Sequence, residues 1–199
     1  MKQQEVLATK QPMTVEAYIE FEEQSEIRHE FINGNLIPMP GTTADHNEIC
    51  INIVQLLRAN LQGNAPFKIH QENVKLQITS EKDYTYPDVV VVTDPRDFEN
   101  QYIKKYPSVI FEVLSKNSRI EDSADKFFRY KNIESLQNYI LVDSEKVFVE
   151  VRIKLENGDW EAATYLQADK KFPIPALGLE LDLRAVYEGV RFYTKANKG

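Results

Sequence analysis

Two short apolar runs constrain the fold of this chain more than any other feature. Val89–Val92 and Val109–Leu114 are rich in β-branched and aromatic residues, the pattern of strands that are covered on both faces of a sheet. Each run carries a carboxylate, because Asp88 stands at the head of the first and Glu112 lies inside the second. An ionised carboxylate in a strand core is costly unless it is paired or bound to a cation. The two acids therefore indicate a chemical site built into the core.

The composition is that of an ordinary globular protein. The 199 residues are 42% hydrophobic and 28% charged, and we expect residues 1–11 to form a loose arm and residues 12–199 a single domain. No apolar run approaches the roughly 18–20 residues that span a bilayer, so no membrane association is expected. The single cysteine, Cys50, excludes an internal disulfide, which fits a cytoplasmic location. The net charge of −7 argues against non-specific coating of nucleic acid and suits a site that collects divalent cations.

The order of the expected elements predicts an α/β fold. The segments around the two core strands are a helix at 14–23, a hairpin at 29–39, a helix at 43–61, a half-buried strand at 67–78, a helix at 121–131, a strand at 137–143 and a hairpin at 147–166. The segment 94–107 is polar with little regular pattern, and the tail at 172–190 is pinned by prolines and then short-helical. This order predicts a mixed central sheet flanked by helices.

Glu30 and His46, two polar residues upstream of the core strands, can each be interpreted either as functional or as purely structural. Glu30 shares a strand face with Ile32, where it is either a functional acid or a solvated carboxylate. His46 lies on the apolar stripe at the first turn of the 43–61 helix, which is the usual setting of a buried, hydrogen-bonded packing histidine. It lies two residues from Glu48, so the pair does not share a helix face and makes no zinc motif.

The helix after the second core strand brings a lysine and further basic residues. Asp122, Lys126 and Tyr130 are spaced i, i+4 and i+8 and therefore line one face, although an ordinary solvated Asp–Lys pair has the same spacing. The basic residues of this stretch are Lys116, Arg119, Lys126, Arg129 and Lys131. They either engage phosphates beside the acids or belong to a solvated helix of mixed charge.

An ordered set of motifs along the chain resembles a known family. The set comprises Pro87-Asp88, EVLS at 112–115, a lysine-bearing helix, YILVD at 139–143 and, upstream, MTVEAYIEFEE, RHEFINGNL and a histidine-bearing helix after a glycine turn. The closing ALGLELDLRAVYEG matches as well, so the resemblance covers about residues 12–190. The chain thereby resembles the Uma-type putative restriction endonuclease family, part of the PD-(D/E)XK nuclease superfamily.

The resemblance implies a restriction-endonuclease-like core in which acidic residues hold Mg²⁺ at one edge of the central sheet. Asp88 and Glu112 occupy the matching metal-ligand positions, Glu30 resembles the early acidic position, and the backbone carbonyl of Val113 is a further ligand. Mg²⁺ prefers such hard oxygen ligands and needs only one or two carboxylates, and Mn²⁺ is a possible substitute. The resemblance thus implies four catalytic residues, which are Glu30, Asp88, Glu112 and Lys126.

One position departs from the pattern of the superfamily. Its Glu-x-Lys motif would place a lysine at position 114, where this chain has Leu114, and a leucine cannot orient a nucleophilic water. The resemblance suggests a migrated lysine, Lys126, that reaches back from the following helix. Lys116, just past the strand end, is the competing choice, and a weakened or dead site is the third possibility.

The expected function is a Mg²⁺-dependent endonuclease that hydrolyses phosphodiester bonds in DNA. The alternative is a catalytically inert module with a nuclease fold that binds DNA or a protein partner. A homodimer is expected from the resemblance and from the apolar material between Phe172 and Leu183, since symmetric pairs are the commonest soluble oligomers.

Overall fold

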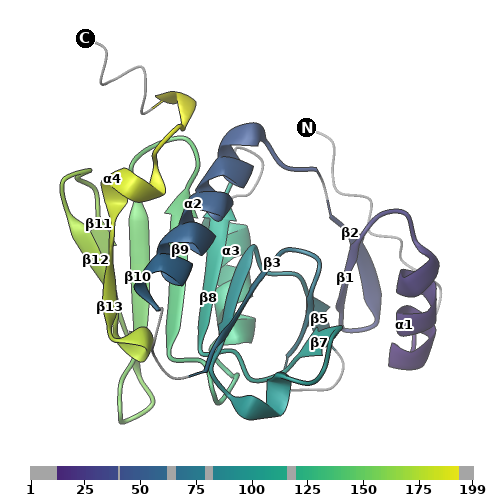
Figure 1. The fold of residues 1–199 in the computed structure, drawn as a ribbon. Coiled ribbons are helices and arrows are strands. Elements are labelled where there is room, and N and C mark those ends of the chain that lie inside the picture. Colours follow the sequence, from purple (N-terminus) through teal and green to yellow (C-terminus); the bar gives the residue numbers. More distant parts are fainter. Residues whose placement is uncertain (1–12, 40, 62–65, 79–82, 116–119, 193–199) are drawn as a thin grey trace.

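Two β-sheets of different size form the frame of the molecule (Figure 1). The computed structural model describes residues 13–39, 41–61, 66–78, 83–115 and 120–192. Within these ranges the central sheet has six strands, which are β3 (Lys68–Gln71), β6 (Val89–Val92), β8 (Val109–Leu114), β9 (Asn138–Asp143), β10 (Val149–Lys154) and β11 (Trp160–Tyr165). They lie in the order β11-β10-β9-β8-β6-β3, with β8 and β9 parallel and the other neighbours antiparallel. The predicted α/β fold with a mixed central sheet is confirmed.

The two longer helices cover opposite faces of the central sheet. On one face α2 (Ala44–Asn60) packs Ile49 and Ile53 against a cluster that includes Val89, Val91 and the odd-numbered residues of β8. On the other face α3 (Ile120–Tyr130) packs Phe127 and Tyr130 against Ile110 of β8. Because side chains alternate along a strand, Glu112 has the parity of Ile110 and points toward α3.

The second sheet stands beside α3 and carries the first helix. Its five strands among the described residues are β1 (His29–Ile32), β2 (Asn35–Pro38), β4 (Lys75–Ile78), β5 (Asp83–Thr85) and β7 (Ile103–Lys104), in the order β2-β1-β5-β4-β7. On its outer face α1 (Val15–Gln24) places the Tyr18 ring on that of Phe31, with 4.6 Å between the centroids. By the same alternation Glu30 faces away from α1, on the side of the sheet where Leu76 and Ile78 meet α3.

The hairpins predicted from Asn-Gly turns are confirmed. The two residues between β1 and β2 are Asn33 and Gly34, with φ of 51° and 81°, and Ile32 pairs with Asn35 across them. Such left-handed angles in both turn positions match the twist of the flanking strands. The hairpin of β10 and β11 closes around Gly158, whose φ is 87°.

The segment 67–78 is two strands and not one, so that prediction is wrong. The chain breaks at Glu72 and Asn73, where φ is 43° and 53°. Before the break β3 pairs with β6 of the central sheet, and after it β4 pairs with β5 of the second sheet. The physical reason is a change of phase, since the apolar positions are odd at Ile69 and even from Val74 onward.

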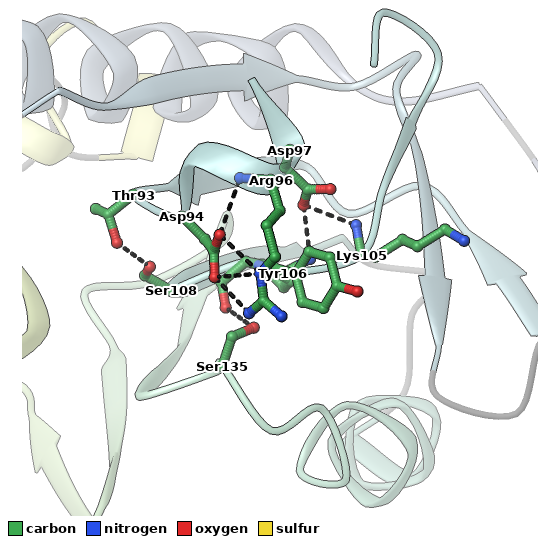
Figure 2. A network of polar contacts seen from close by, with 9 residues as sticks. Thr93, Asp94, Arg96, Asp97, Lys105, Tyr106, Ser108 and Ser135 are labelled. Carbon is green, nitrogen blue, oxygen red and sulfur yellow. Dashed lines mark hydrogen bonds and ion pairs between the residues drawn. The ribbon is translucent and has the colours of Figure 1, made fainter. Parts of the chain in front are cut away.

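The polar excursion between β6 and β8 is held by its own network (Figure 2). The buried carboxylate of Asp97 accepts hydrogen bonds from the backbone N–H groups of Lys105 and Tyr106, at 2.8 and 2.6 Å. The Arg96 guanidinium lies 3.8 Å from the centre of the Tyr106 ring, and Asp97 closes a 3₁₀ turn at Pro95–Asp97. Polar residues without a visible period thus form an ordered loop that keeps β6 and β8 neighbours.

The tail packs on the α2 side of the central sheet. It contains a further antiparallel pair, β12 (Lys171–Ile174) and β13 (Leu179–Asp182), followed by the short helix α4 (Leu183–Val186). The short helix was predicted, and the strand pair was not. The predicted arm at 1–11 lies outside the described residues. None of the helices in the described ranges is long and apolar enough to cross a membrane.

Candidate active site

Asp88 stands at the head of β6 and is held from two directions. Its Oδ2 accepts a hydrogen bond of 2.6 Å from the backbone N–H of Val113 in β8. Its Oδ1 lies 3.3 Å from Nε2 of His46 in α2. The Asp88 side chain keeps 14% of its surface exposed, so this carboxylate is fixed in orientation and still reachable from solvent.

Glu112 points from the middle of β8 to α3, where two side chains meet it. Lys126 Nζ donates to Oε2 at 2.9 Å, and the Tyr130 hydroxyl donates to Oε1 at 2.9 Å. Lys126 and Tyr130 are four residues apart on one helix face, as the sequence predicts, and the side chain of Asp122 lies outside the described part. The Tyr130 hydroxyl also lies 3.2 Å from Thr85 Oγ1. Both oxygens of a buried carboxylate therefore have defined partners.

Glu30 joins this group from the second sheet. Its Oε1 lies 3.4 Å from Lys126 Nζ, but the geometry is not that of a hydrogen bond, and this buried oxygen has no hydrogen-bond partner among the described residues. Glu30 is buried, so it is not the solvated strand carboxylate of the plainer interpretation. Lys126 thus lies between two carboxylates that come from different sheets.

Burial and crowding of like charges govern the electrostatics of the group. Burial raises the pKa of Glu112 to about 7, Lys126 opposes this shift, and the nearby Asp88 and Glu30 add to it. Burial would lower the pKa of Lys126, but the carboxylates of Glu112 and Glu30 outweigh it and hold that pKa well above its usual value. Burial likewise holds the pKa of Tyr130 well above its usual value. At neutral pH Lys126 is therefore an ammonium and Tyr130 a phenol, and both are donors.

The raised pKa of Glu112 makes the stability of the metal-free protein depend on pH. A carboxyl whose pKa rises from 4.5 to about 7 on folding stabilises the fold below its unfolded pKa, and this contribution is lost as the pH rises toward 7. Glu112→Gln keeps the shape and removes the charge, while Lys126 retains Glu30 nearby. In chelator at pH 8 we expect this variant to melt about 2–4 °C above the parent, which corresponds to roughly 1 kcal/mol for a chain of this size.

The matched control for this experiment is Glu161→Gln, on the exposed part of β11. It should leave the melting temperature unchanged at both pH values. At pH 5 the Glu112→Gln variant should melt together with the parent, because the carboxyl is then protonated in the fold. A Glu112→Gln variant that melts well below the parent at pH 8 would show that the pairing with Lys126 outweighs the cost of burying the charge.

A second set of side chains meets Asp88 on the α2 side. One donor atom from each of His46, Cys50, Glu72 and Asp88 lies within 4.8 Å of every other. His46 and Cys50 come from α2, and His46 Nδ1 lies 3.7 Å from Cys50 Sγ. Glu72 comes from the break between β3 and β4, and its backbone N–H donates to the backbone carbonyl of Asp88 at 3.0 Å. Asp88 therefore belongs to two groups, one on each side of the sheet edge.

No functional role was predicted from the sequence for His46, Cys50 or Glu72, although local signals for their positions exist. His46 is buried and hydrogen-bonded as expected, but its partner is Asp88. Cys50 follows His46 by one helical turn, and Thr43 caps that turn by accepting the backbone N–H of His46 at 3.2 Å. The signal for Glu72 is the change of phase in the 67–78 segment.

Two further predicted positions complete the comparison with the sequence. Leu114 is partly buried and packs with the cluster around α3, so it contributes no polar atom to the site. The competing lysine, Lys116, lies outside the described residues, as does Arg119.

Comparison with known proteins places the chain in a family. The chain matches the family described as "Uma2: Putative restriction endonuclease" over residues 15–184. Two proteins of Synechocystis sp. are similar along most of their length. Uncharacterized protein slr1290 is 32% identical over 180 residues, which cover 90% of this chain and 94% of the relative. Uncharacterized protein sll1609 is 34% identical over 157 residues, which cover 78% and 88%.

A solved structure shares the fold. It is the crystal structure of a protein from Anabaena variabilis described as a putative nuclease belonging to DUF820, with a TM-score of 0.76 and 17% identity over 90% of this chain and all of that one. At this identity the likeness shows the fold alone. Because the family match spans most of the sequence and the relatives are similar over nearly their full length, the chain belongs to the Uma2 family of putative restriction endonucleases.

Proposed function

We propose that this protein is a Mg²⁺-dependent endonuclease that hydrolyses phosphodiester bonds in DNA. Membership of the family and the shared fold support a nuclease-like function. The observation that carries the finer proposal is that Lys126 lies between Glu112 of the central sheet and Glu30 of the second sheet, with Asp88 near enough for its charge to raise the pKa of Glu112.

The oxygen donors of this group fit a hard dication. Asp88 and Glu112 supply carboxylates, and each carboxylate has lone pairs beyond those used by its present partners. The N–H and C=O of one strand residue point to the same side, and the N–H of Val113 points to Asp88. The next carbonyl, that of Leu114, points the other way to the N–H of Ser144. The Val113 carbonyl is therefore directed toward Asp88, where it supports the role of a third ligand.

The Oε1 of Glu30, which has no hydrogen-bond partner among the described residues, and the raised pKa of Glu112 both fit a site that binds a cation. Mg²⁺ bound by Asp88, Glu112 and the Val113 carbonyl would polarise a phosphoryl oxygen and make a water more acidic. Mn²⁺ takes the same oxygen ligands and is expected to substitute.

The protein side chains would then orient the reacting groups. Hydrolysis adds the oxygen of water to phosphorus and breaks one ester P–O bond. Lys126 remains an ammonium at neutral pH, so its role is to donate hydrogen bonds to the water or to the phosphate oxygens. Glu30 Oε1 lies 3.4 Å from Lys126 Nζ and accepts no hydrogen bond from the described residues, so it is proposed to accept a proton of that water. Tyr130 fixes the carboxylate plane of Glu112 through its hydroxyl.

Two cationic side chains near Tyr86 support a nucleic-acid substrate, although the protein as a whole has a negative net charge. The side chains of Arg28 and Lys75 lie over the Tyr86 ring, at 5.5 and 5.9 Å from its centre. Tyr86 precedes Asp88 by two residues, and both cations are proposed to contact the phosphate backbone of a bound strand. Contacts of this kind position the strand without reading its sequence.

The deciding experiment is cleavage of supercoiled plasmid DNA by the purified protein. With Mg²⁺ or Mn²⁺ we expect conversion to nicked and linear forms, and with EDTA none, because the carboxylates cannot activate water without the ion. An RNA of similar length tests the choice of substrate. Protein that binds plasmid in a gel shift but leaves it intact with either ion would establish the inert binding module instead.

A homodimer and a cytoplasmic location are parts of the same proposal. A symmetric pair would bring two sites to the two strands of a duplex, and the single buried cysteine suits a reducing compartment. Light scattering at tens of micromolar protein should give twice the chain mass of 23.1 kDa, and a monomer mass there would contradict the dimer.

A further inference from the structure

The four side chains on the α2 side of Asp88 differ in chemistry from the proposed magnesium site. They offer an imidazole nitrogen from His46, a thiol sulfur from Cys50 and carboxylate oxygens from Glu72 and Asp88. Nitrogen and sulfur donors select borderline-soft transition metals, whereas Mg²⁺ avoids them. A mixed set of four donors is the number and type that Zn²⁺ takes in closed tetrahedral sites.

The geometry of the set is close to what such an ion needs. In a tetrahedral zinc site with bonds of about 2.0–2.3 Å, neighbouring donors lie roughly 3.5 Å apart. The four donor atoms here lie within 4.8 Å of one another, so turning side chains about their χ angles by small amounts closes the shell. His46 and Cys50 are held one helical turn apart on α2, and Asp88 is held by the Val113 N–H, so most of the set is already in place.

Glu72 provides independent evidence that this group of side chains binds a ligand. Its backbone adopts φ of 43°, a left-handed conformation that costs energy for a residue other than glycine. The conformation is held by the hydrogen bond from its N–H to the Asp88 carbonyl. Its side chain also presents a buried oxygen, Oε1, with no hydrogen-bond partner among the described residues. A carboxylate oxygen of Glu72 lies within 4.8 Å of the other three donor atoms, so a cation between the four side chains would pair this acid.

We propose that His46, Cys50, Glu72 and Asp88 form a binding site for a transition-metal dication such as Zn²⁺, separate from the oxygen-only site at Glu112. Asp88 is common to both sites. An ion held by all four side chains occupies Asp88 and leaves no open position for substrate, so it inhibits the cleavage that depends on Mg²⁺. The inhibition rests on the proposed nuclease function, whereas the binding of the ion does not.

Binding is tested without any substrate, by titrating the chelator-treated protein with Co²⁺ as a coloured substitute for Zn²⁺. We expect one Co²⁺ per chain with d–d bands of a tetrahedral ion and a thiolate-to-metal charge-transfer band, and Zn²⁺ should displace it. Cys50→Ser should abolish the charge-transfer band. Glu72→Gln, at a half-buried surface position, should keep the fold and the band and weaken affinity about 10–100-fold.

Glu161→Gln, which changes an exposed acid of β11, is the matched control and should leave Co²⁺ affinity unchanged. The proposal is overturned if the parent binds no stoichiometric Co²⁺, if the parent lacks the thiolate band, or if affinity falls no more in Glu72→Gln than in Glu161→Gln. Circular dichroism of each variant shows whether it is folded. If Cys50→Ser does not fold, the affinity of Glu72→Gln decides the test.

A separate arm measures plasmid cleavage in Mg²⁺ with increasing Zn²⁺. Glu72→Gln should retain cleavage and need about tenfold more Zn²⁺ than the parent for half inhibition. Equal sensitivity of parent and variant would contradict the regulatory part. A protein that binds Co²⁺ as described but never cleaves DNA would refute the nuclease proposal and leave the metal site standing, so the two failures are distinguishable.

Discussion

Asp88→Asn is expected to lower the rate of metal-dependent DNA cleavage by about 10³-fold. Stabilisation of transition-state charge by a bound dication contributes several kcal/mol, and about 4 kcal/mol corresponds to that factor. The asparagine keeps the shape but replaces one carboxylate oxygen by an NH₂ group. In the parent an Asp88 oxygen faces the Val113 N–H and the other oxygen faces His46 Nε2, so the NH₂ group would take the place of one of these acceptors. Metal affinity falls because the charge is lost and because the remaining oxygen cannot serve both neighbours.

The plasmid assay at several Mg²⁺ concentrations measures this effect. Asp94→Asn is the matched control, since Asp94 is a carboxylate of the loop after β6 that pairs with Arg96 rather than with the site. It should cleave within about twofold of the parent, the range of substitutions that touch no functional group. Unchanged cleavage by Asp88→Asn, with a normal melting curve, would remove the proposed site altogether.

The core strands and most helices could be predicted because local patterns specify them. Continuous apolar runs gave β6 and β8, and the four-residue spacing in α3 placed Lys126 and Tyr130 on one face, where both reach Glu112. The 67–78 segment could not be placed in the same way. Its alternation is that of a strand on both sides of Glu72, and only pairing with distant partners sends its halves to two different sheets.

The residues near Glu112 were predictable from the sequence, whereas those on the α2 side of Asp88 were not. Asp88 and Glu112 stand out in sequence because a charge inside an apolar run is costly. His46 and Cys50 sit on an apolar helical stripe, where a histidine and a cysteine look like ordinary core residues. Their nearness to Asp88 depends on the packing of α2 over the sheet, which joins residues about forty positions apart. The four-residue spacing of His46 and Cys50 shows that they share a helix face, but local periodicity carries no information on their contact with Asp88.

Lys126→Ala is expected to reduce cleavage by about 10²–10⁴-fold, the contribution typical of a group that positions or activates a water. Lys126 Nζ lies 2.9 Å from Glu112 and 3.4 Å from Glu30, and we propose that it takes the role of the strand lysine that Leu114 does not provide. Because its pKa is held well above the usual value, the pH–rate profile should show no lysine ionisation near neutrality. Lys131→Ala, just beyond the same helix, is the matched control and should change the rate little. Lys116→Ala should cost less than Lys126→Ala, and the reverse order would assign the role to Lys116.

Loss of Lys126 also leaves Glu112 and Glu30 facing each other without their cation, so instability could imitate a catalytic defect. Removing one partner of a buried ion pair costs about 3–5 kcal/mol, and less here because a quarter of the Lys126 side chain is exposed. The double variant Lys126→Met with Glu112→Gln replaces the ion pair by neutral groups of similar shape and should recover most of the parent's melting temperature. The variant pair Lys126→Met and Glu30→Gln does the same while keeping Glu112 as a metal ligand. If this second pair is stable and still binds Mn²⁺ but cleaves far less DNA than Glu30→Gln alone, Lys126 acts on the reaction itself. Recovery of cleavage together with stability would reduce Lys126 to a structural counter-ion.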